Sequence, residues 1–135
     1  IKIKEEKLSN IFIHPGNYID LLDNLGGASL NAIHILFPDP WPKTRHHKRR
    51  FFTPENIEKM CFALKKGGRI FVATDVEEYA SQITESMAER SDFEAERFLI
   101  REFKSPLGDK FQTKFERKAY TSDRVPKYMI FKRIE

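Results

Sequence analysis

Hydrophobic residues along the first ninety positions form short continuous runs that alternate with stripes at helical spacing. The runs Asn10–His14, Ala32–Phe37 and Arg69–Thr74 predict three strands. A stripe follows each run and predicts a helix. These stripes are Tyr18, Leu21, Leu22 and Leu25, then Ile57, Met60, Cys61 and Leu64, and then Val76, Tyr79, Ala80, Ile83 and Met87. The alternation favours an α/β fold with an open, mostly parallel sheet and helices on both faces.

Local signals mark where these helices begin and end. The sequence Thr53-Pro54-Glu55 is typical of a helix start, and residues 65–68 (KKGG) predict the end of that helix. Asn17 is a candidate N-cap of the first helix. Asp75, with Glu78 three residues later, predicts a capping box for the third helix.

The pattern changes after residue 90. Phe93–Ile100 and Lys127–Ile134 predict two further strands, joined by a polar stretch that contains Pro106, Gly108 and the sequence TKFERK. No helix of good periodicity is predicted between them, so we expect an antiparallel pair at one edge of the sheet. Residues 1–135 show no linker or internal repeat and are expected to form one domain.

The composition indicates a folded core and limits the functional classes. The 135 residues are 40% hydrophobic and 13% aromatic, which excludes wholesale disorder. No apolar run approaches the roughly 20 residues of a membrane span, so no membrane partner is expected. The single cysteine, Cys61, cannot form an internal disulfide and is expected to be a core thiol, and no Cys/His spacing indicates a metal site. A reducing cytoplasm is the expected compartment.

The net charge of +4 comes from one short segment. Residues 43–50 (KTRHHKRR) hold five Lys or Arg and no acid, while the rest of the chain has 19 basic against 20 acidic residues. Such a cluster is typical of contact with a polyanion, although basic runs also occur on solvated faces and in localisation signals. The candidate contacts to nucleic acid are therefore Lys43, Arg45, His46, His47, Lys48, Arg49 and Arg50.

Three polar residues follow the predicted strands at their carboxyl ends, where ligands collect in such sheets. They are Asn17, Asp39 and Asp75. Each alone fits a helix cap or a turn, but three on one rim beside a basic segment favour function. Prolines on either side of Asp39 and Trp41 restrict the backbone, which suits binding of a planar nucleobase by stacking and by a carboxylate that accepts hydrogen bonds.

The segment Phe37–Glu55 (FPDPWPKTRHHKRRFFTPE) closely resembles the signature of the bacterial-type tRNA (guanine-N7-)-methyltransferases. Members of that family use S-adenosylmethionine to methylate a guanine in the tRNA variable loop. The likeness extends through residues 64–79 (LKKGGRIFVATDVEEY) and Thr113–Lys118, and more loosely through Asn10–Leu22. It implies a Rossmann-like methyltransferase fold, S-adenosylmethionine as cofactor and tRNA as partner.

The resemblance also implies roles for individual residues. Asp39 resembles the family's acidic residue at the active site, beside the methyl donor and the target base, and is the candidate catalytic residue and a candidate cofactor contact. Asn17 falls where the family commonly has an aspartate that contacts the adenine of the cofactor. The implied RNA-interacting loop is Arg45–Arg50. The implied substrate contacts are Lys43, Asp75, Thr113, Lys114, Phe115 and Glu116. Guanine N7 carries no proton at neutral pH, so we expect Asp39 and Asp75 to bind or orient rather than to accept a proton.

The glycine-rich turn that opens methyltransferases of this fold is not found in this sequence. Its six glycines, at positions 16, 26, 27, 67, 68 and 108, form no G-x-G turn ahead of the first predicted strand. We therefore expect this chain to be the C-terminal part of a longer protein, with the N-terminal glycine-rich strand-helix units missing here. A fragment that pairs with another subunit and an inactive remnant are the alternatives.

Two other functions stay open from the sequence. One is a catalytically silent fragment that binds tRNA or another RNA. The other is a nucleic-acid amino-methyltransferase, because FPDPW loosely resembles the D-P-P-[YFW] motif of those enzymes. The sequence leaves both a monomer and a homodimer possible.

Overall fold

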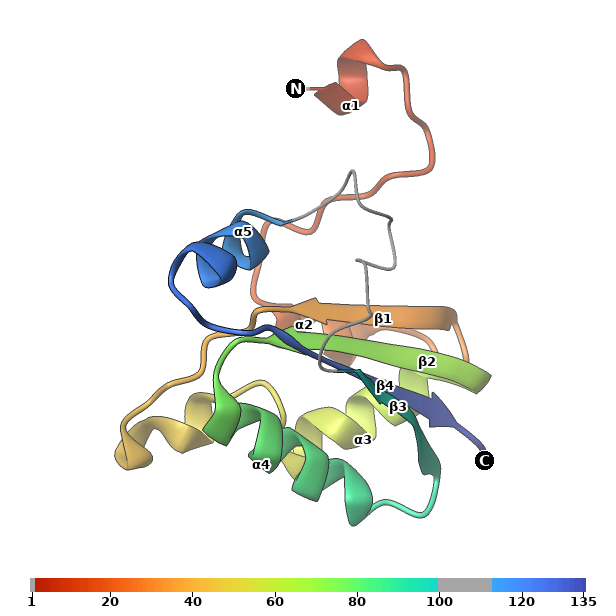
Figure 1. Cartoon of the computed structure of the whole chain (residues 1–135). Helices are drawn as coiled ribbons and strands as arrows, with labels where there is room; N and C mark the ends of the chain where they lie inside the picture. The colour runs from red at the N-terminus through yellow and green to blue at the C-terminus, as the bar shows by residue number, and fades with distance from the viewer. Residues whose placement is uncertain (1, 100–112) are drawn as a thin grey trace.

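The computed structural model describes residues 2–99 and 113–135 (Figure 1). Its helices are α1 (Lys2–Glu5), α2 (Tyr18–Asn24), the 3-10 helix η1 (Thr44–Arg49), α3 (Pro54–Ala63), α4 (Glu77–Ala88) and α5 (Lys114–Thr121). Its strands are β1 (Leu30–Leu36), β2 (Leu64–Thr74), β3 (Phe93–Leu99) and β4 (Lys127–Arg133). Within the described ranges, no helix is long and apolar enough to cross a membrane.

The strands form one mixed sheet in the order β1-β2-β4-β3. β1 and β2 run parallel, whereas β4 is antiparallel to both β2 and β3. The predicted α/β class is confirmed, and so is the antiparallel pair at one edge. Among the described strands only the β1–β2 pairing is parallel, so this part of the sheet is mixed rather than mostly parallel, because β4 runs against both of its neighbours. Ile100, Pro106 and Gly108 lie outside the described residues.

The hydrophobic core lies between the sheet and helices α3 and α4, which Figure 1 shows beneath it. Ile70 and Val72 of β2 alternate with residues of the other face and are fully buried, as are Met129 and Phe131 of β4. The apolar stripes predicted for α3 and α4 supply the facing side of this core: Ile57, Met60, Cys61, Tyr79, Ala80, Ile83 and Met87. Thr53 caps α3 as predicted, because its side chain accepts a hydrogen bond from the Asn56 amide.

The two faces of the sheet are covered unequally. Figure 1 shows α5 on the side opposite α3 and α4, at the end of the sheet where β1 and β2 finish. In β1, alternate residues Ala32, His34 and Leu36 are exposed, whereas Ile35 is buried. The expectation that this apolar run is covered on both faces is therefore wrong for the described residues. The physical reason is that α3 and α4 pack on one face of the sheet, and among the described residues no helix covers Ala32, His34 and Leu36 on the other.

Three predicted elements differ from the structure. Asn10–His14 is irregular and exposed rather than a strand, because an apolar run needs a neighbouring strand to satisfy its backbone. Residues 65–68 belong to β2 rather than to a helix end, and the pairing of β1 with β2 shifts register there. Gly67 absorbs this irregularity with a φ of +79°. A helix, α5, precedes β4 where none was predicted.

A charged cluster fastens the start of β3 to α3 and α4. Arg90 contacts Asp92 through its Nε at 2.8 Å and Glu58 through Nη1 at 2.6 Å. The Cys61 thiol donates to the Asp92 carboxylate at 3.0 Å, and burial raises the pKa of Cys61 to about 11. Hydrogen bonding from Arg90 holds the pKa of Asp92 at about 2. Cys61 is therefore an inert core thiol, as its isolation in the sequence predicts.

This cluster predicts an acid-sensitive contribution to stability. Because the pKa of Asp92 is lowered on folding, the stabilisation is present above about pH 4 and is lost as the pH falls toward 2. We expect Asp92→Asn to lower the free energy of unfolding by roughly 2 kcal/mol at pH 7. Urea titrations should show the gap to the wild type narrowing below pH 4. Glu94→Gln, an exposed carboxylate on β3, is the control, and a gap independent of pH would contradict this assignment.

Candidate active site

The carboxyl ends of β1 and β2 bring Asp39 and Asp75 to one rim. Leu36 pairs with Ala73, and the Phe37 amide donates to the Ala73 carbonyl at 2.7 Å just before the two chains separate. Asp39 then follows β1, and Asp75 follows β2. The predicted convergence of these two carboxylates therefore has a direct cause in the parallel pairing of the strands.

Asp39 lines two pockets. The first, of about 850 Å³, is lined by Asp39 and Trp41 together with Asn17, Tyr18, Arg49 and the first turn of α3; we refer to it as the Trp41 pocket. The second, of about 350 Å³, is the Phe115 pocket, which combines Asp39 with Phe37, Asp75, Phe115, Lys118 and Arg124. Both volumes suit small-molecule or nucleotide-sized groups. One exposed carboxylate thus serves both cavities.

The loop that carries Asp39 is strained and locally braced. Phe37 and Trp41 have φ angles of +53° and +42°, a left-handed conformation that costs of order 1–3 kcal/mol for a non-glycine residue. The Trp41 amide donates to Asp39 Oδ1 at 3.1 Å. The guanidinium of Arg49 lies 5.1 Å from the centre of the Trp41 ring, and the His46 ring meets the same indole edge-on at 5.7 Å. The prolines and these contacts together hold the carboxylate and the indole in place.

Asn17 reaches the Trp41 pocket from the start of α2, although no strand precedes it. Its Oδ1 accepts a hydrogen bond from the Ile19 amide at 3.0 Å, so the predicted N-cap is confirmed. Tyr18 packs against Phe51 with ring centres 4.3 Å apart, which fixes α2 beside the pocket. Asn17 remains exposed, and the second lone pair of its Oδ1 can accept from a ligand.

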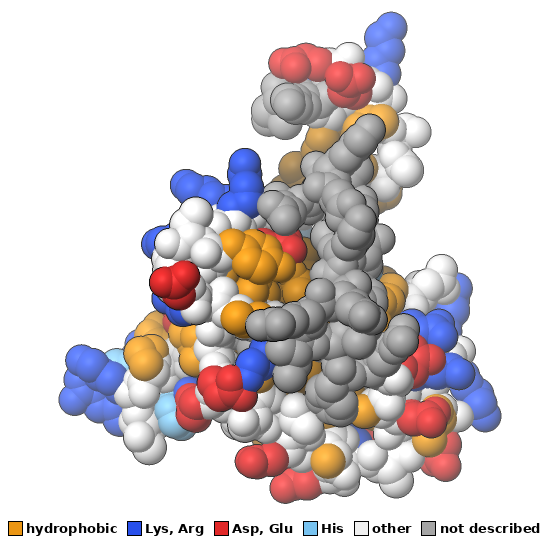
Figure 2. Space-filling view, viewed as in Figure 1, with side chains coloured by type: hydrophobic (Ala, Val, Ile, Leu, Met, Phe, Trp, Pro, Cys, Tyr) orange, Lys and Arg blue, Asp and Glu red, His pale blue; other side chains and the backbone are white. Residues whose placement is uncertain are grey.

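Most of the predicted basic segment forms an exposed protrusion. Residues 44–49 form η1, and Figure 2 shows Lys, Arg and His side chains gathered in this region, at the lower left of the molecule. Arg45, Lys48 and Arg49 are exposed, whereas His46 and His47 are half-buried. Lys43 is also exposed and does not line either pocket. The charge is thus presented to solvent beside the Trp41 pocket.

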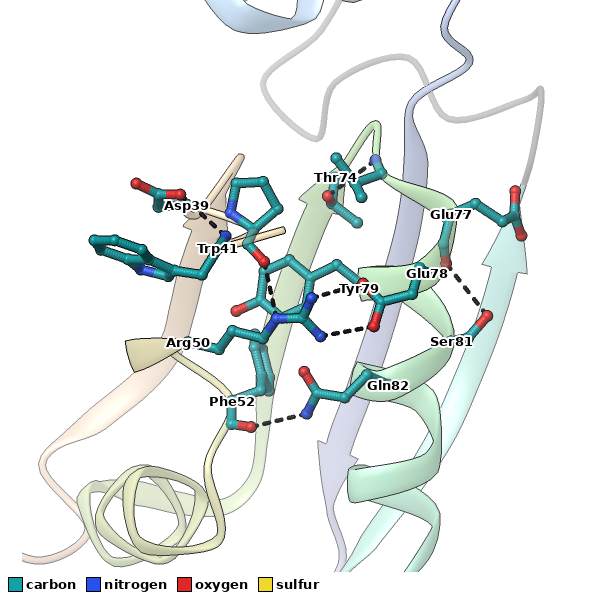
Figure 3. Close-up of polar contacts among 12 residues, drawn as sticks. Asp39, Trp41, Arg50, Phe52, Thr74, Glu77, Glu78, Tyr79, Ser81 and Gln82 are labelled. Atoms are coloured by element: carbon teal, nitrogen blue, oxygen red, sulfur yellow. Dashed lines mark hydrogen bonds and ion pairs between the residues drawn. The ribbon is translucent and has the colours of Figure 1, made fainter. Parts of the chain in front are cut away.

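Arg50 differs from its basic neighbours, because it is only 2% exposed. Its guanidinium donates to both carboxylate oxygens of Glu78, at 2.9 and 2.6 Å, and its Nε donates to the Pro40 carbonyl at 2.8 Å (Figure 3). The hydrogen bonds from Arg50 lower the pKa of Glu78. The prediction that Arg50 contacts RNA is therefore not supported, since all three of its nitrogens bond within the protein.

The Phe115 pocket contains an ion pair that the sequence does not indicate. Arg124 Nε lies 2.8 Å from Asp75, whose side chain is 17% exposed. This pairing, with that of Glu78 to Arg50, replaces the predicted capping box of α4, whose N-cap is Val76. Isolated charged residues such as Arg124 carry no sequence signal, because their partner is defined only by the packing of α5 and β4.

The late motif TKFERK forms the first turns of α5. Thr113 and Glu116 make a capping box in which each side chain bonds the other residue's backbone, and this T-x-x-E pattern is the sequence signal that could have indicated α5. Glu116 is buried and accepts a hydrogen bond from the Tyr128 hydroxyl, whose pKa is raised chiefly by burial. Phe115 is 61% exposed and stacks toward Phe37, with ring centres 6.4 Å apart.

The substrate contacts predicted at residues 113–116 divide into two groups, according to whether their side chains are available to a ligand or bond within the protein. Phe115 lines its pocket, and Lys114 is exposed at the start of α5. Thr113 and Glu116 use their side chains within the protein. Among the described residues, no group of three or more His, Cys, Asp or Glu could hold a metal ion.

Solved structures define the class of fold. An rRNA methylase from Streptococcus thermophilus matches 99% of this chain and 64% of its own, with a TM-score of 0.58 and 12% identity. An S-adenosylmethionine-dependent O-methyltransferase from Thermotoga maritima covers 99% of this chain and 44% of its own, with a TM-score of 0.53 and 14% identity. The fold is that of the S-adenosylmethionine-dependent methyltransferases.

A family model described as "Putative methyltransferase" matches residues 1–128, and the chain belongs to this methyltransferase family. Curated relatives named tRNA (guanine-N(7)-)-methyltransferase confirm the resemblance found in the sequence. The relative from Ruegeria pomeroyi is 43% identical over 99% of this chain and 56% of its own length. The relative from Nitrosomonas europaea is 36% identical over 98% of this chain and 58% of its own length. The chain therefore spans little more than half the length of these relatives.

The capping box predicts a measurable role for Thr113. Removing the hydroxyl in Thr113→Ala should cost about 1 kcal/mol of local helix stability, which corresponds to about fivefold faster amide hydrogen exchange in α5. Mass spectrometry of exchange in residues 114–121 tests this. Thr121→Ala, at the other end of α5, is the matched control. Unchanged exchange in Thr113→Ala would show that the cap contributes nothing.

Proposed function

We propose that this chain forms the guanine-facing and RNA-binding part of an S-adenosylmethionine-dependent tRNA (guanine-N7-)-methyltransferase. The observation that carries the proposal is that Asp39 lines two adjacent pockets, one beside Asn17 and one beside Asp75. A methyltransferase needs such a boundary, because donor and acceptor must meet in line at one point. The names of the relatives support tRNA and guanine N7 as substrate and target.

The residues around the Trp41 pocket fit one end of S-adenosylmethionine. Asn17 Oδ1 can accept from the adenine amino group, and the adjacent Tyr18 and Ile19 supply apolar surface for the base. The exposed Asp39 carboxylate can pair with a cationic or donor group of the cofactor. When bound, S-adenosylmethionine supplies an activated sulfonium methyl group. The sequence of this chain contains no glycine-rich turn that could bind the remainder of the S-adenosylmethionine molecule.

The Phe115 pocket fits the target guanine. The Phe115 ring offers a stacking surface, and the carboxylates of Asp39 and Asp75 can accept hydrogen bonds from the N1–H and the exocyclic amino group of guanine. Arg124 and Lys118 add N–H groups that can donate hydrogen bonds to the guanine O6. Since N7 carries a lone pair and no proton, these residues orient the base and remove no proton from it.

The reaction can be tested with a hybrid in which this chain follows the N-terminal part of the Ruegeria pomeroyi relative. We expect the hybrid to form 7-methylguanosine in tRNA, detected by nucleoside mass spectrometry. Asp39→Ala should lower turnover roughly 100-fold or more, because misplacement of donor or base defeats the in-line geometry. The dissociation constant for tRNA should stay unchanged, since Asp39 lies outside η1.

Glu85→Ala, which removes an exposed carboxylate on α4, is the control for Asp39→Ala and should retain turnover. A folded hybrid that binds tRNA without forming 7-methylguanosine would contradict the proposed function and favour a silent RNA-binding fragment. An N-methylated adenine or cytosine as product would favour the amino-methyltransferase instead.

The protrusion η1 is proposed to contact tRNA phosphates. We expect a Lys48→Gln/Arg49→Gln variant to bind tRNA more weakly than the wild type. The slope of log K against log salt should become shallower by roughly one for each phosphate that the variant no longer neutralises. Lys65→Gln/Lys66→Gln removes the same charge from exposed positions at the start of β2 and is the matched control. Equal salt slopes in both variants would argue against phosphate contact by η1.

A further inference from the structure

Arg50 occupies a position between the proposed RNA-binding protrusion and the loop that carries Asp39. It follows η1 directly in the chain, yet its side chain is buried, with Nε bonded to the Pro40 carbonyl and the guanidinium directed at Glu78, as Figure 3 shows for the latter. Its guanidinium also lies 4.9 Å from the ring centre of Tyr79, which is fully buried. One side chain therefore connects η1, the Asp39 loop and α4.

The contact with Pro40 acts on a strained point of the loop. The Pro40 carbonyl belongs to the peptide that joins Pro40 to Trp41, and Trp41 is held at a φ of +42°. A bulky residue keeps such a conformation only where its surroundings impose it. Arg50 Nε fixes one side of this peptide, while the Asp39 carboxylate binds its amide hydrogen. Hydrogen bonds therefore restrain both sides of the peptide from which the Trp41 indole projects.

α4 provides a rigid base for this arrangement. Glu78 binds Arg50, the Tyr79 hydroxyl accepts from the Phe51 amide at 3.1 Å, and Gln82 Nε2 donates to the Phe52 carbonyl at 3.0 Å. Three consecutive residues of the chain are thus fastened along one side of a helix. The fork geometry of a guanidinium, with Nε free for a third acceptor, is required to reach Glu78 and Pro40 together.

We propose that Arg50 is a positioning residue that holds Asp39 and Trp41 at the boundary of the two pockets and ties them to the RNA-binding protrusion. The inference rests on the proposed function for its effect on turnover, but its structural part stands separately. It contrasts with a phosphate contact, in which the positive charge alone would suffice.

The single tryptophan of the chain provides a direct probe, because Trp41 is the only source of indole fluorescence. Arg50→Lys keeps the charge and loses the fork. We expect acrylamide to quench Trp41 more strongly in Arg50→Lys than in the wild type, while the affinity for tRNA and its salt slope stay unchanged. Glu78→Gln, which retains one acceptor oxygen, should give a smaller increase in quenching and covers the case in which Arg50→Lys does not fold.

Turnover is measured with the hybrid protein that carries the N-terminal part of the Ruegeria pomeroyi relative. Arg50→Lys should lower kcat roughly 100-fold, as expected for a misplaced reacting group, with little change in KM for tRNA. Arg69→Lys disrupts a matched two-point pair with Glu96, at 2.7 and 2.9 Å, far from the pockets, and should leave both values unaltered.

The outcomes separate this inference from the proposed function. An inactive wild-type hybrid would overturn the proposed function alone, and Trp41 quenching would still decide the positioning role. An active hybrid whose Arg50→Lys variant turns over normally would overturn the positioning role alone. Weaker tRNA binding by Arg50→Lys with unchanged quenching would instead assign Arg50 to the RNA contact.

Discussion

The bidentate pairing of Arg50 with Glu78 anchors the loop that carries Asp39 to a helix of the core. A buried guanidinium is costly to desolvate, and it is tolerated here because a carboxylate, a backbone carbonyl and an aromatic face all surround it. Since Glu78 belongs to α4 and Pro40 to the loop after β1, the pairing connects a helix of the core to the strained FPDPW segment. The strain in that segment persists because this network opposes its relaxation.

The basic segment divides its charge between two tasks that its composition does not distinguish. Arg45, Lys48 and Arg49 project to solvent, where they can meet a polyanion, whereas Arg50 is buried and pairs with Glu78, whose side chain is 61% exposed. Arg49 is intermediate, because it is exposed yet lies over Trp41. The charged groups that line the Trp41 pocket are Lys48, Arg49 and Arg50 together with the carboxylates of Asp39 and Glu55, so the pocket combines both signs of charge.

Elements whose signal is local were predictable from the sequence, while those that depend on distant partners were not. The stripes of α3 and α4 and the Thr53 cap follow from spacing and chemistry within one helix. Asn10–His14 resembles a strand in composition. A strand forms only where a second strand bonds its backbone, however, and the local sequence does not show whether such a partner is present. Asp39 and Asp75 were located because parallel strands end together. The partners Arg124 and Glu78 depend on packing across 49 and 28 positions of the chain, respectively, and no pattern indicates them.

The strand order has a consequence for how the protein folds. β4, the last strand in the chain, lies between β2 and β3, so β3 gains its described partner only after residue 127 has been synthesised. Until then β2 also lacks its antiparallel neighbour. Contacts between positions so far apart in the chain raise the contact order and slow folding. The Phe115 pocket, which needs α5 as well as the end of β1, is accordingly among the last parts to assemble, and a nascent chain acquires the basic protrusion η1 before that pocket is complete.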